Sequence, residues 1–223
     1  MNESSDHREA WVRECLAPQY PELVAPYLEA QQIYDRAKDS GRLDAADTEC
    51  LLAHARSSRT PLGYNAATML GELHARIPAL GAAIRSLAEG RRAHERVNAV
   101  IALHFGPPTE LHIELLELLL RDKSARVRAL AADKIVGHQL KQLAGALEVA
   151  ANRVTNPKVA EGLRAELDYL LHRFHVHHLG ETVGVTCRPL QGGSITKVFT
   201  RQAYETVGRA WIDDELKGSQ GET

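Results

Sequence analysis

A short apolar motif recurs every 30 to 33 residues from Thr60 onward, and this repeat constrains the fold more than any other feature of the chain. Its four copies begin at Asn65-Ala66-Ala67, Val97-Asn98-Ala99-Val100, Val127-Arg128-Ala129-Leu130 and Val159-Ala160. Two helices of about a dozen residues each, joined by short turns, fill such a period at about 1.5 Å of rise per residue. The repeat therefore predicts a series of stacked helical hairpins.

Each of the first three motifs is followed by a break and then by a second stretch rich in leucine or alanine. The breaks are Ile77-Pro78, Gly106-Pro107-Pro108 and Gly137, and the second stretches span 80–87, 111–120 and 140–151. One hairpin cannot bury both of its apolar faces, so neighbouring hairpins must stack to form a continuous core. Because such stacks have atypical ends, we expect residues 1–46 to form N-terminal capping helices and residues 47–178 to form the repeat solenoid.

The composition agrees with closely packed helices. Of 223 residues, 31 are Ala and 29 are Leu, which are strong helix formers, whereas aromatic residues make up 5%. The 27 Lys and Arg residues nearly balance the 29 Asp and Glu residues, so the chain lacks the basic character that non-specific nucleic-acid binding requires. The first residues carry no secretory leader and no run of 18 apolar residues occurs, which predicts a cytoplasmic protein with no membrane partner.

The last part of the chain has a different pattern. Val183, Val185 and Cys187 alternate with polar residues, as is typical of a strand, and a second β-branched run spans 194–200 after a Gly-rich turn. We expect residues 179–217 to form a β-hairpin followed by a helix that Thr200 caps, and residues 218–223 to form a disordered tail. A single longer helix over 195–211 is the alternative.

The segment 118–132, with the sequence LLLRDKSARVRALAA, resembles the junction between two HEAT-like repeats. The resemblance implies an all-α fold, a right-handed α-α superhelix of HEAT-like repeats, here with a small C-terminal β-hairpin plus helix. It also implies that Asp122, at the turn, and Arg128, on the next helix, take part in a hydrogen-bonded ladder along the inner turns. The positions that match Arg128 in the other repeats hold Asn65, Asn98 and Ala160, so the sequence supports one rung.

A histidine cluster is the main candidate for metal chemistry. It comprises His172, His175, His177 and His178, where the helical pattern ends. Their spacing matches no closed set of four ligands, and the dipole of a helix also favours imidazoles at its C-terminus. We therefore interpret them as a capped surface cluster, with a metal site as the alternative.

The other residues with reactive side chains form no recognisable motif. Cys15, Cys50 and Cys187 are far apart in the sequence, which indicates buried small hydrophobic residues in a reducing compartment. The chain has no GxSxG, GxGxxG or GxxxxGK[ST] motif. We therefore expect no catalytic residue and no cofactor.

Binding of another protein is the function that this pattern favours. The second helices of the repeats place mixed charges between their leucines, at Arg85, Glu89, His112, Glu114, Glu117, Lys141 and Glu148, which we expect to be exposed and to contact a partner. Complementary charges on an elongated surface suit recognition of a protein. We therefore expect a non-catalytic protein-binding module, such as an adaptor, an assembly factor or a toxin-neutralising immunity-type protein.

A HEAT-like enzyme, such as a DNA glycosylase for alkylated bases, is the alternative. Those enzymes are similar to this chain in length and helical content, and they use a strongly basic concave face with tryptophans and an acidic residue. Here Trp11 and Trp211 both lie outside the repeats and the net charge is −2. These two features disfavour nucleic acid as a partner.

Overall fold

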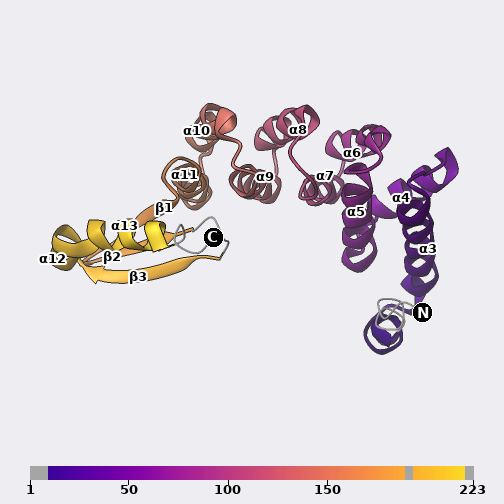
Figure 1. Ribbon diagram of the computed structural model, residues 1–223, viewed down its shortest axis with the longest axis horizontal. Coiled ribbons are helices and arrows are strands. Elements are labelled where there is room, and N and C mark those ends of the chain that lie inside the picture. The colour runs from indigo at the N-terminus through magenta and orange to yellow at the C-terminus, as the bar shows by residue number, and fades with distance from the viewer. Residues whose placement is uncertain (1–9, 189–192, 219–223) are drawn as a thin grey trace. The chain divides into compact units, whose positions relative to one another are not determined.

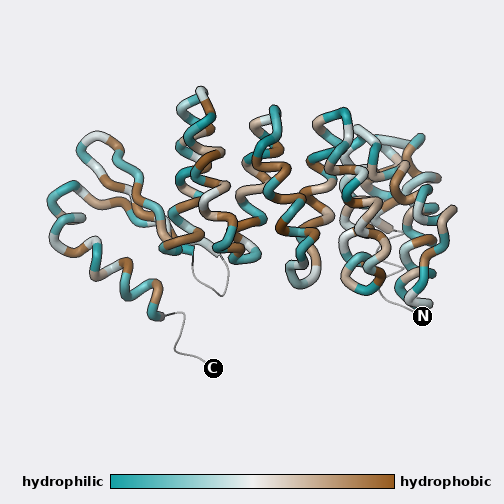
Figure 2. The backbone as a smooth tube through the Cα atoms, turned by 90° about the horizontal axis from the view of Figure 1, so that it is seen from above, coloured by the Kyte–Doolittle hydropathy of each residue, from teal (hydrophilic) through white to brown (hydrophobic). Residues whose placement is uncertain are grey.

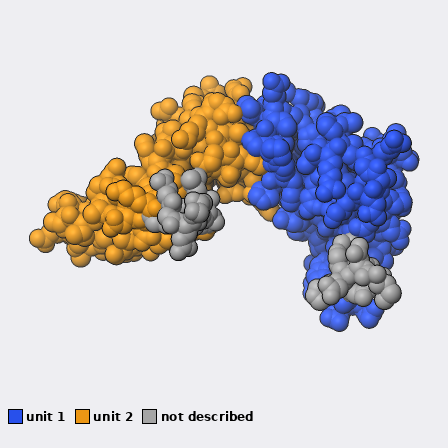
Figure 3. All heavy atoms as spheres, viewed as in Figure 1, with its two compact units in different colours: residues 1–115 blue, residues 116–223 orange. Residues whose placement is uncertain are grey.

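The computed structural model describes residues 10–188 and 193–218. The chain divides into two compact units, residues 1–115 and residues 116–223 (Figure 3). Helices make up most of both units, and unit 2 adds a small antiparallel sheet (Figure 1). The expected tail over 218–223 lies outside the described residues, apart from Gly218 at the end of the last helix.

Unit 1 begins with short helical segments that lead into one long helix. These are the π-helix η1 (Val12–Leu16), α2 (Ala17–Gln19) and the 3-10 helix η2 (Pro21–Leu23), followed by α3 (Val24–Ser40). Pro18 and Pro21 lie in the first turns of α2 and η2, where a missing N–H costs nothing. α3 ends at Gly41, whose φ of 67° places it in the left-handed region, and the Gly41 N–H donates to the carbonyl of Ala37 (2.9 Å).

The following helices of unit 1 alternate between two layers. They are α4 (Ala45–Ala55), α5 (Thr60–His74), α6 (Gly81–Ala88) and α7 (Ala93–Ala102), with the 3-10 helix η3 (Pro78–Leu80) before α6. The next helix, α8 (Glu110–Leu120), begins in unit 1, and its residues from Leu116 onward belong to unit 2. α5 packs against α3 and α7, while α4 packs against α6. Contacts of α4 with α5 and of α6 with α7 join the layers. The predicted breaks Ile77-Pro78 and Gly106-Pro107-Pro108 lie between α5 and α6 and between α7 and α8, and these helices carry apolar and polar residues along their length (Figure 2).

Two glycines allow α5 to lie close to its neighbours. A Cβ at Gly71 would lie 2.2 Å from the carbonyl oxygen of Ala102, and a Cβ at Gly63 would lie 2.4 Å from that of Ser57. Both distances are far below van der Waals contact, so no side chain fits at either position. The small-residue bias of the sequence thus has a specific role here: it sets the distance between α5 and α7.

Unit 2 continues with helices of the same kind. They are α9 (Ala125–Gly137), the 3-10 helix η4 (Lys141–Leu143), α10 (Ala144–Arg153) and α11 (Pro157–His172). α11 packs against both α9 and α10, and it begins at Asn156, whose side chain accepts from the N–H groups of Lys158 and Val159. η4 leads into α10 as η3 leads into α6, and each 3-10 helix ends in a buried leucine, Leu80 or Leu143. The two units therefore share a local hairpin design.

A three-stranded sheet with the order β1-β2-β3 follows α11. Its strands are β1 (Phe174–Leu179), β2 (Thr182–Cys187) and β3 (Ile195–Thr200), and the short helix α12 (Arg201–Ala203), the π-helix η5 (Tyr204–Gly208) and α13 (Arg209–Gly218) come after it. In the antiparallel register, Cys187 lies opposite both Phe174 and Ile195. One face of the sheet packs against α13, as Figure 1 shows, through a core formed by Val183, Val185, Cys187, Phe199 and Ile212.

The strand β1 shows that the repeat region expected over 47–178 is wrong at its end, because residues 174–178 belong to a strand. α11 ends at His172 because Arg173 has a φ of 67° and donates its N–H to the carbonyl of Tyr169. Beyond it, Phe174 and Val176 face the sheet core while His175 lies on the opposite face. The predicted hairpin is present as β2 and β3, and the Thr200 side chain caps α12; the alternative helix over 195–211 is wrong, because 195–200 is a strand.

Candidate binding groove

A groove of about 1290 Å³ lies in unit 1 along α6. It is bounded by the end of α4, the turn between α6 and α7, and the first turn of α8. Its charged lining consists of four arginines and three glutamates: Arg56, Arg85, Arg91, Arg92, Glu89, Glu95 and Glu110. Its apolar lining comes from Pro78, Gly81, Ala82 and Leu111. Two of the predicted contact residues, Arg85 and Glu89, therefore lie in one concave site.

An ion pair between Arg85 of α6 and Glu114 of α8 lies beside this groove. Arg85 Nη1 and Nη2 donate to the two carboxylate oxygens of Glu114, each at 2.6 Å. These hydrogen bonds raise the pKa of Arg85 and lower the pKa of Glu114. Exposed pairs add little to stability, so the effect of this pair is to fix the direction of the guanidinium at the groove. Glu114, itself a predicted contact residue, thus holds the side chain of Arg85 in place.

Arg56, at the end of α4, lies on the other side of the groove. Its Nη2 donates to the hydroxyl of Ser86 on α6 (2.6 Å), and its carbonyl lies 3.0 Å from Nε2 of His94 on α7. Arg56 is not among the contact residues that the sequence predicts. The signal that points to it is its position in the turn after α4, because the turn after α6 likewise holds arginines, Arg91 and Arg92.

His112, which we expected on the surface, is buried with 1% of its area exposed. Its Nδ1 lies 3.2 Å from the backbone nitrogen of Thr109 and 2.8 Å from the Thr109 hydroxyl, so the ring folds back over the start of α8. The rings of His112 and His74 are 6.0 Å apart, and burial lowers the pKa of His74. His112 is therefore part of the interior, and the expectation that its side chain is exposed is wrong.

The remaining predicted contact residues lie on elements of unit 2. Glu117 forms an ion pair with Arg121 one helical turn later, and both line a second groove of about 770 Å³ between the end of α8 and α10. Lys141 and Glu148 are exposed on η4 and α10. Neither is among the described residues that line this second groove. The predicted set of contacts is thus divided between separate sites.

Asp122 and Arg128 are hydrogen bonded, and the contact uses the backbone of Asp122. Arg128 Nη1 donates to the Asp122 carbonyl (2.6 Å), while the Asp122 carboxylate accepts from the N–H of Ser124 (2.7 Å). In unit 1 the residue with the equivalent contact is Arg96, which donates to the carbonyl of Gly90 (2.8 Å). Asn98, matched to Arg128 by sequence, instead donates to the carbonyl of Ala55 (2.7 Å).

The predicted histidine cluster is separated by the geometry of β1. His175 and His177 share one face, with ring centroids 4.2 Å apart, whereas His178 points to the other face. His175 is buried, and its Nδ1 lies 2.5 Å from a carboxylate oxygen of Asp168 on α11. The side chain of His175 is therefore occupied by an interaction with α11, and the expectation of a capped surface cluster does not hold for it.

A half-buried ion pair joins Glu166 of α11 to Arg188, the residue after β2. Arg188 donates to both carboxylate oxygens of Glu166, at 2.8 and 3.0 Å, and its guanidinium lies 4.0 Å above the ring centre of Tyr169. Burial raises the pKa of Glu166, and the hydrogen bonds from Arg188 oppose this effect. Because each charged group has a partner, this cluster has the character of a structural link between helix and sheet.

The comparisons with known proteins do not extend these observations. No family model, no curated protein and no solved structure matches this chain. Among the described residues, no helix combines the length and the apolar character that a membrane span requires.

Proposed function

We propose that this protein is a non-catalytic binding module of the HEAT-like α-solenoid class that recognises a segment of another protein in the groove along α6. The observation that carries this proposal is the mixed lining of that groove, in which four arginines and three glutamates accompany the apolar residues Pro78, Ala82 and Leu111. A polypeptide segment matches such a surface, because it offers both signs of charge together with apolar side chains. An adaptor, an assembly factor and an immunity-type protein of the cytoplasm all act in this way.

The packing of the helices supports the solenoid class. In unit 1, α3, α5 and α7 form one layer beside α4 and α6, and in unit 2 α11 packs on both α9 and α10. The contacts of Arg96 and Arg128 with the preceding turns repeat from one hairpin to the next. In stacked hairpins of this kind, each repeat contacts its neighbours and leaves an extended face for binding.

The charges of the groove disfavour the DNA glycosylase alternative. Glu89, Glu95 and Glu110 lie among the arginines, and Glu114 neutralises Arg85, so a phosphate backbone would meet as many carboxylates as guanidinium groups. No Trp, Tyr or Phe is among the described residues that line the groove. Trp211 packs on Phe199 in the core of the sheet, with ring centroids 5.6 Å apart. The described lining of this groove thus lacks the tryptophans that such enzymes use.

Affinity capture with a matched pair of variants tests the proposal. The wild-type protein, tagged, is used to isolate partners from an extract of its own cells at moderate salt, and the affinity of the recovered protein is then measured with purified components. Ala82, exposed in the groove, is replaced in Ala82→Trp, and Ala46, exposed on α4 away from it, is replaced in Ala46→Trp. We expect Ala82→Trp to weaken binding at least about tenfold, which corresponds to about 1.4 kcal/mol, and Ala46→Trp to bind as the wild type does.

Two results overturn the proposal. One is a partner that binds Ala82→Trp and Ala46→Trp equally well, which places recognition outside the groove. The other is recovery of nucleic acid without a protein partner, with an affinity that falls steeply as salt is raised. Circular dichroism spectra of both variants establish that the helical content is unchanged.

A further inference from the structure

Three side chains with metal-binding atoms converge between α3 and α4, away from the groove. Cys50 Sγ lies 3.4 Å from His54 Nε2, and His54 Nε2 lies 3.1 Å from Glu29 Oε2. All three ligand atoms lie within 4.8 Å of one another. Among the described residues, this is the one group of three or more His, Cys, Asp or Glu side chains that meets this distance.

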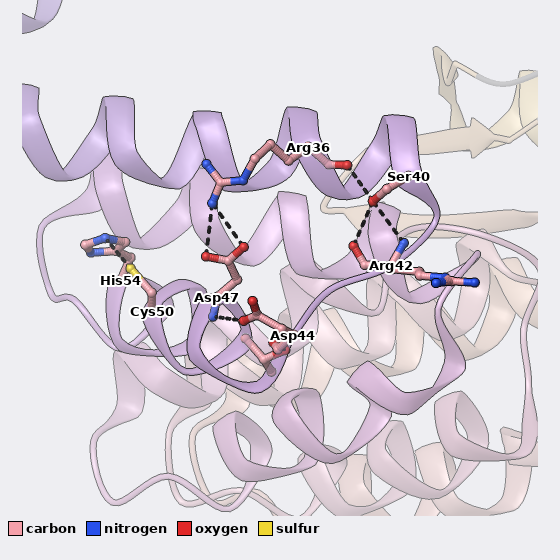
Figure 4. A network of polar contacts seen from close by, with 8 residues as sticks. Arg36, Ser40, Arg42, Asp44, Asp47, Cys50 and His54 are labelled. Carbon is pink, nitrogen blue, oxygen red and sulfur yellow. Dashed lines mark hydrogen bonds and ion pairs between the residues drawn. The ribbon is translucent and has the colours of Figure 1, made fainter.

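The positions of the three residues follow from helix geometry. Cys50 and His54 are four residues apart on α4 and therefore lie on the same face, as Figure 4 shows. Glu29 comes from α3, which runs antiparallel to α4. A second contact shows the same alignment of the two helices. Arg36 lies two turns after Glu29, and Asp47 lies two turns before His54. Arg36 donates to both carboxylate oxygens of Asp47, at 3.0 and 3.1 Å. The triad thus lies between two helices with a fixed alignment.

The distances fit the edges of a tetrahedral zinc site. With a Zn–S bond of about 2.3 Å and Zn–N and Zn–O bonds of about 2.0 to 2.1 Å, tetrahedral angles place sulfur about 3.6 Å from nitrogen and nitrogen about 3.3 Å from oxygen. The observed separations of 3.4 and 3.1 Å are close to these values. The side chain of Glu29 is 58% exposed, so its carboxylate oxygen can move to the distance from Cys50 Sγ that a tetrahedral site requires.

We propose that Glu29, Cys50 and His54 form a binding site for a divalent transition metal of the zinc class, with a fourth coordination position open to solvent. A sulfur, a nitrogen and an oxygen donor together select zinc or cobalt over magnesium and calcium, which prefer oxygen alone. Three protein ligands and one open position are the arrangement of zinc sites that bind a further ligand.

Titration with Co²⁺ as the probe tests this site on the full chain. Cobalt bound to a thiolate in tetrahedral geometry gives a sulfur-to-metal charge-transfer band and visible d–d bands, and excess Zn²⁺ then displaces it. We expect one equivalent of Co²⁺ to bind with these bands and Mg²⁺ not to compete. Cys50→Ser abolishes the charge-transfer band, whereas Cys15→Ser, which alters an exposed cysteine of the same unit, retains it.

The other two ligands are tested by affinity. Loss of a residue that merely orients a ligand weakens metal binding by about 10 to 100-fold, so Glu29→Gln and His54→Gln should each weaken Co²⁺ binding at least about tenfold. Glu49→Gln, at an exposed position beside Cys50 on α4, is the matched control and should bind as the wild type does. Glu29 is on the surface, so its variant does not depend on a buried contact for folding.

Three results overturn the proposal. Absence of the charge-transfer band in the reduced wild-type protein shows that the triad does not bind cobalt. A band that persists in Cys50→Ser, or that is lost in His177→Gln, places the metal elsewhere. Displacement of Co²⁺ by Mg²⁺ shows an acidic surface site with no thiolate. None of these readouts depends on the groove of α6, so this site and the proposed function fail or succeed separately.

Discussion

Arg96 and Arg128 make the same contact in two consecutive helical hairpins: each donates from Nη1 to the carbonyl of the residue six positions earlier. The acceptors are Gly90, at 2.8 Å, and Asp122, at 2.6 Å. Arg96 also donates to the carbonyl of Arg91 (3.0 Å). Each arginine thus satisfies carbonyls of the turn that precedes its own helix, and this turn joins one hairpin to the next.

Replacement of Arg96 by Ala should therefore destabilise unit 1. Arg96 is 7% exposed, and its loss leaves the carbonyls of Gly90 and Arg91 without this donor, at a cost of about 1 to 3 kcal/mol. The free energy of unfolding in urea measures the effect. Arg91→Ala, at an exposed position in the same turn, is the control and should change stability by less than about 0.5 kcal/mol. Equal stabilities of the two variants would contradict the assigned role.

Two glycine substitutions should have opposite effects on stability. Gly71→Ala places a Cβ 2.2 Å from the carbonyl oxygen of Ala102, which forces α5 and α7 apart at a cost of about 1 to 3 kcal/mol. Gly162→Ala, in the exposed middle of α11 with nothing within 4 Å, should stabilise the protein by about 0.5 to 1 kcal/mol, since Ala is the better helix former. Thermal unfolding followed by circular dichroism measures both. A stable Gly71→Ala variant is incompatible with the close approach of the two helices.

His74 should make the stability depend on pH in a defined direction. Burial lowers the pKa of His74 below the ordinary value of 6.5, so the unfolded chain binds a proton more readily than the folded protein does. Its contribution to stability is present above pH 6.5 and is lost as the pH falls through the folded-state pKa. A single group contributes at most about 1.4 kcal/mol per pH unit.

The measurement compares urea midpoints between pH 7.5 and pH 5.5 in three proteins. His74→Leu should flatten the decline seen in the wild type, because it removes the buried imidazole. His178→Gln, at an exposed position on β1, should decline as the wild type does. If His74→Leu and the wild type show the same decline, other groups cause it.

Ile212 should be essential for the attachment of α13 to the sheet. It has no exposed surface and packs with Val183, Val185 and Phe199. Ile212→Ala should lower the free energy of unfolding by about 2 to 5 kcal/mol, through lost burial and the cavity that remains. Val207→Ala, at a position that is 52% exposed, is the control. Hydrogen exchange of β2 amides is the direct readout, and unchanged protection in Ile212→Ala would refute the packing role.

The sequence predicts the helical hairpins and their breaks well, because they depend on local periodicity. Ile77-Pro78 and the Gly-Pro-Pro segment at 106–108 do fall between helices, and Thr200 does cap the helix after β3. The match of Asn98 to Arg128 was wrong, because it relied on the apolar motif alone. Arg128 is the fourth residue of its helix, and the fourth residue of α7 is Arg96, which is therefore the counterpart.

The features that the sequence did not reveal depend on partners distant in the chain. His175 is buried in a strand because Asp168 and Tyr169 of α11 cover it, and the histidine-rich stretch alone gives no sign of that cover. The sequence predicts Cys50 to be a buried hydrophobic residue, but its side chain is half-buried and contacts His54, one helical turn later. Glu29, which completes the triad, lies on another helix, and the sequence alone does not reveal how the two helices align. Cys15 is exposed, contrary to expectation.

The contacts of Arg96 and Arg128 also bear on how such a protein can change over generations. Because the arginine of the following helix satisfies the turn carbonyls, the backbone of the turn does not depend on the side chains of Arg91, Arg92 or Lys123 for this purpose. Those exposed side chains line the two grooves. Substitutions at these turns can therefore change the chemistry of both grooves while the scaffold stays the same.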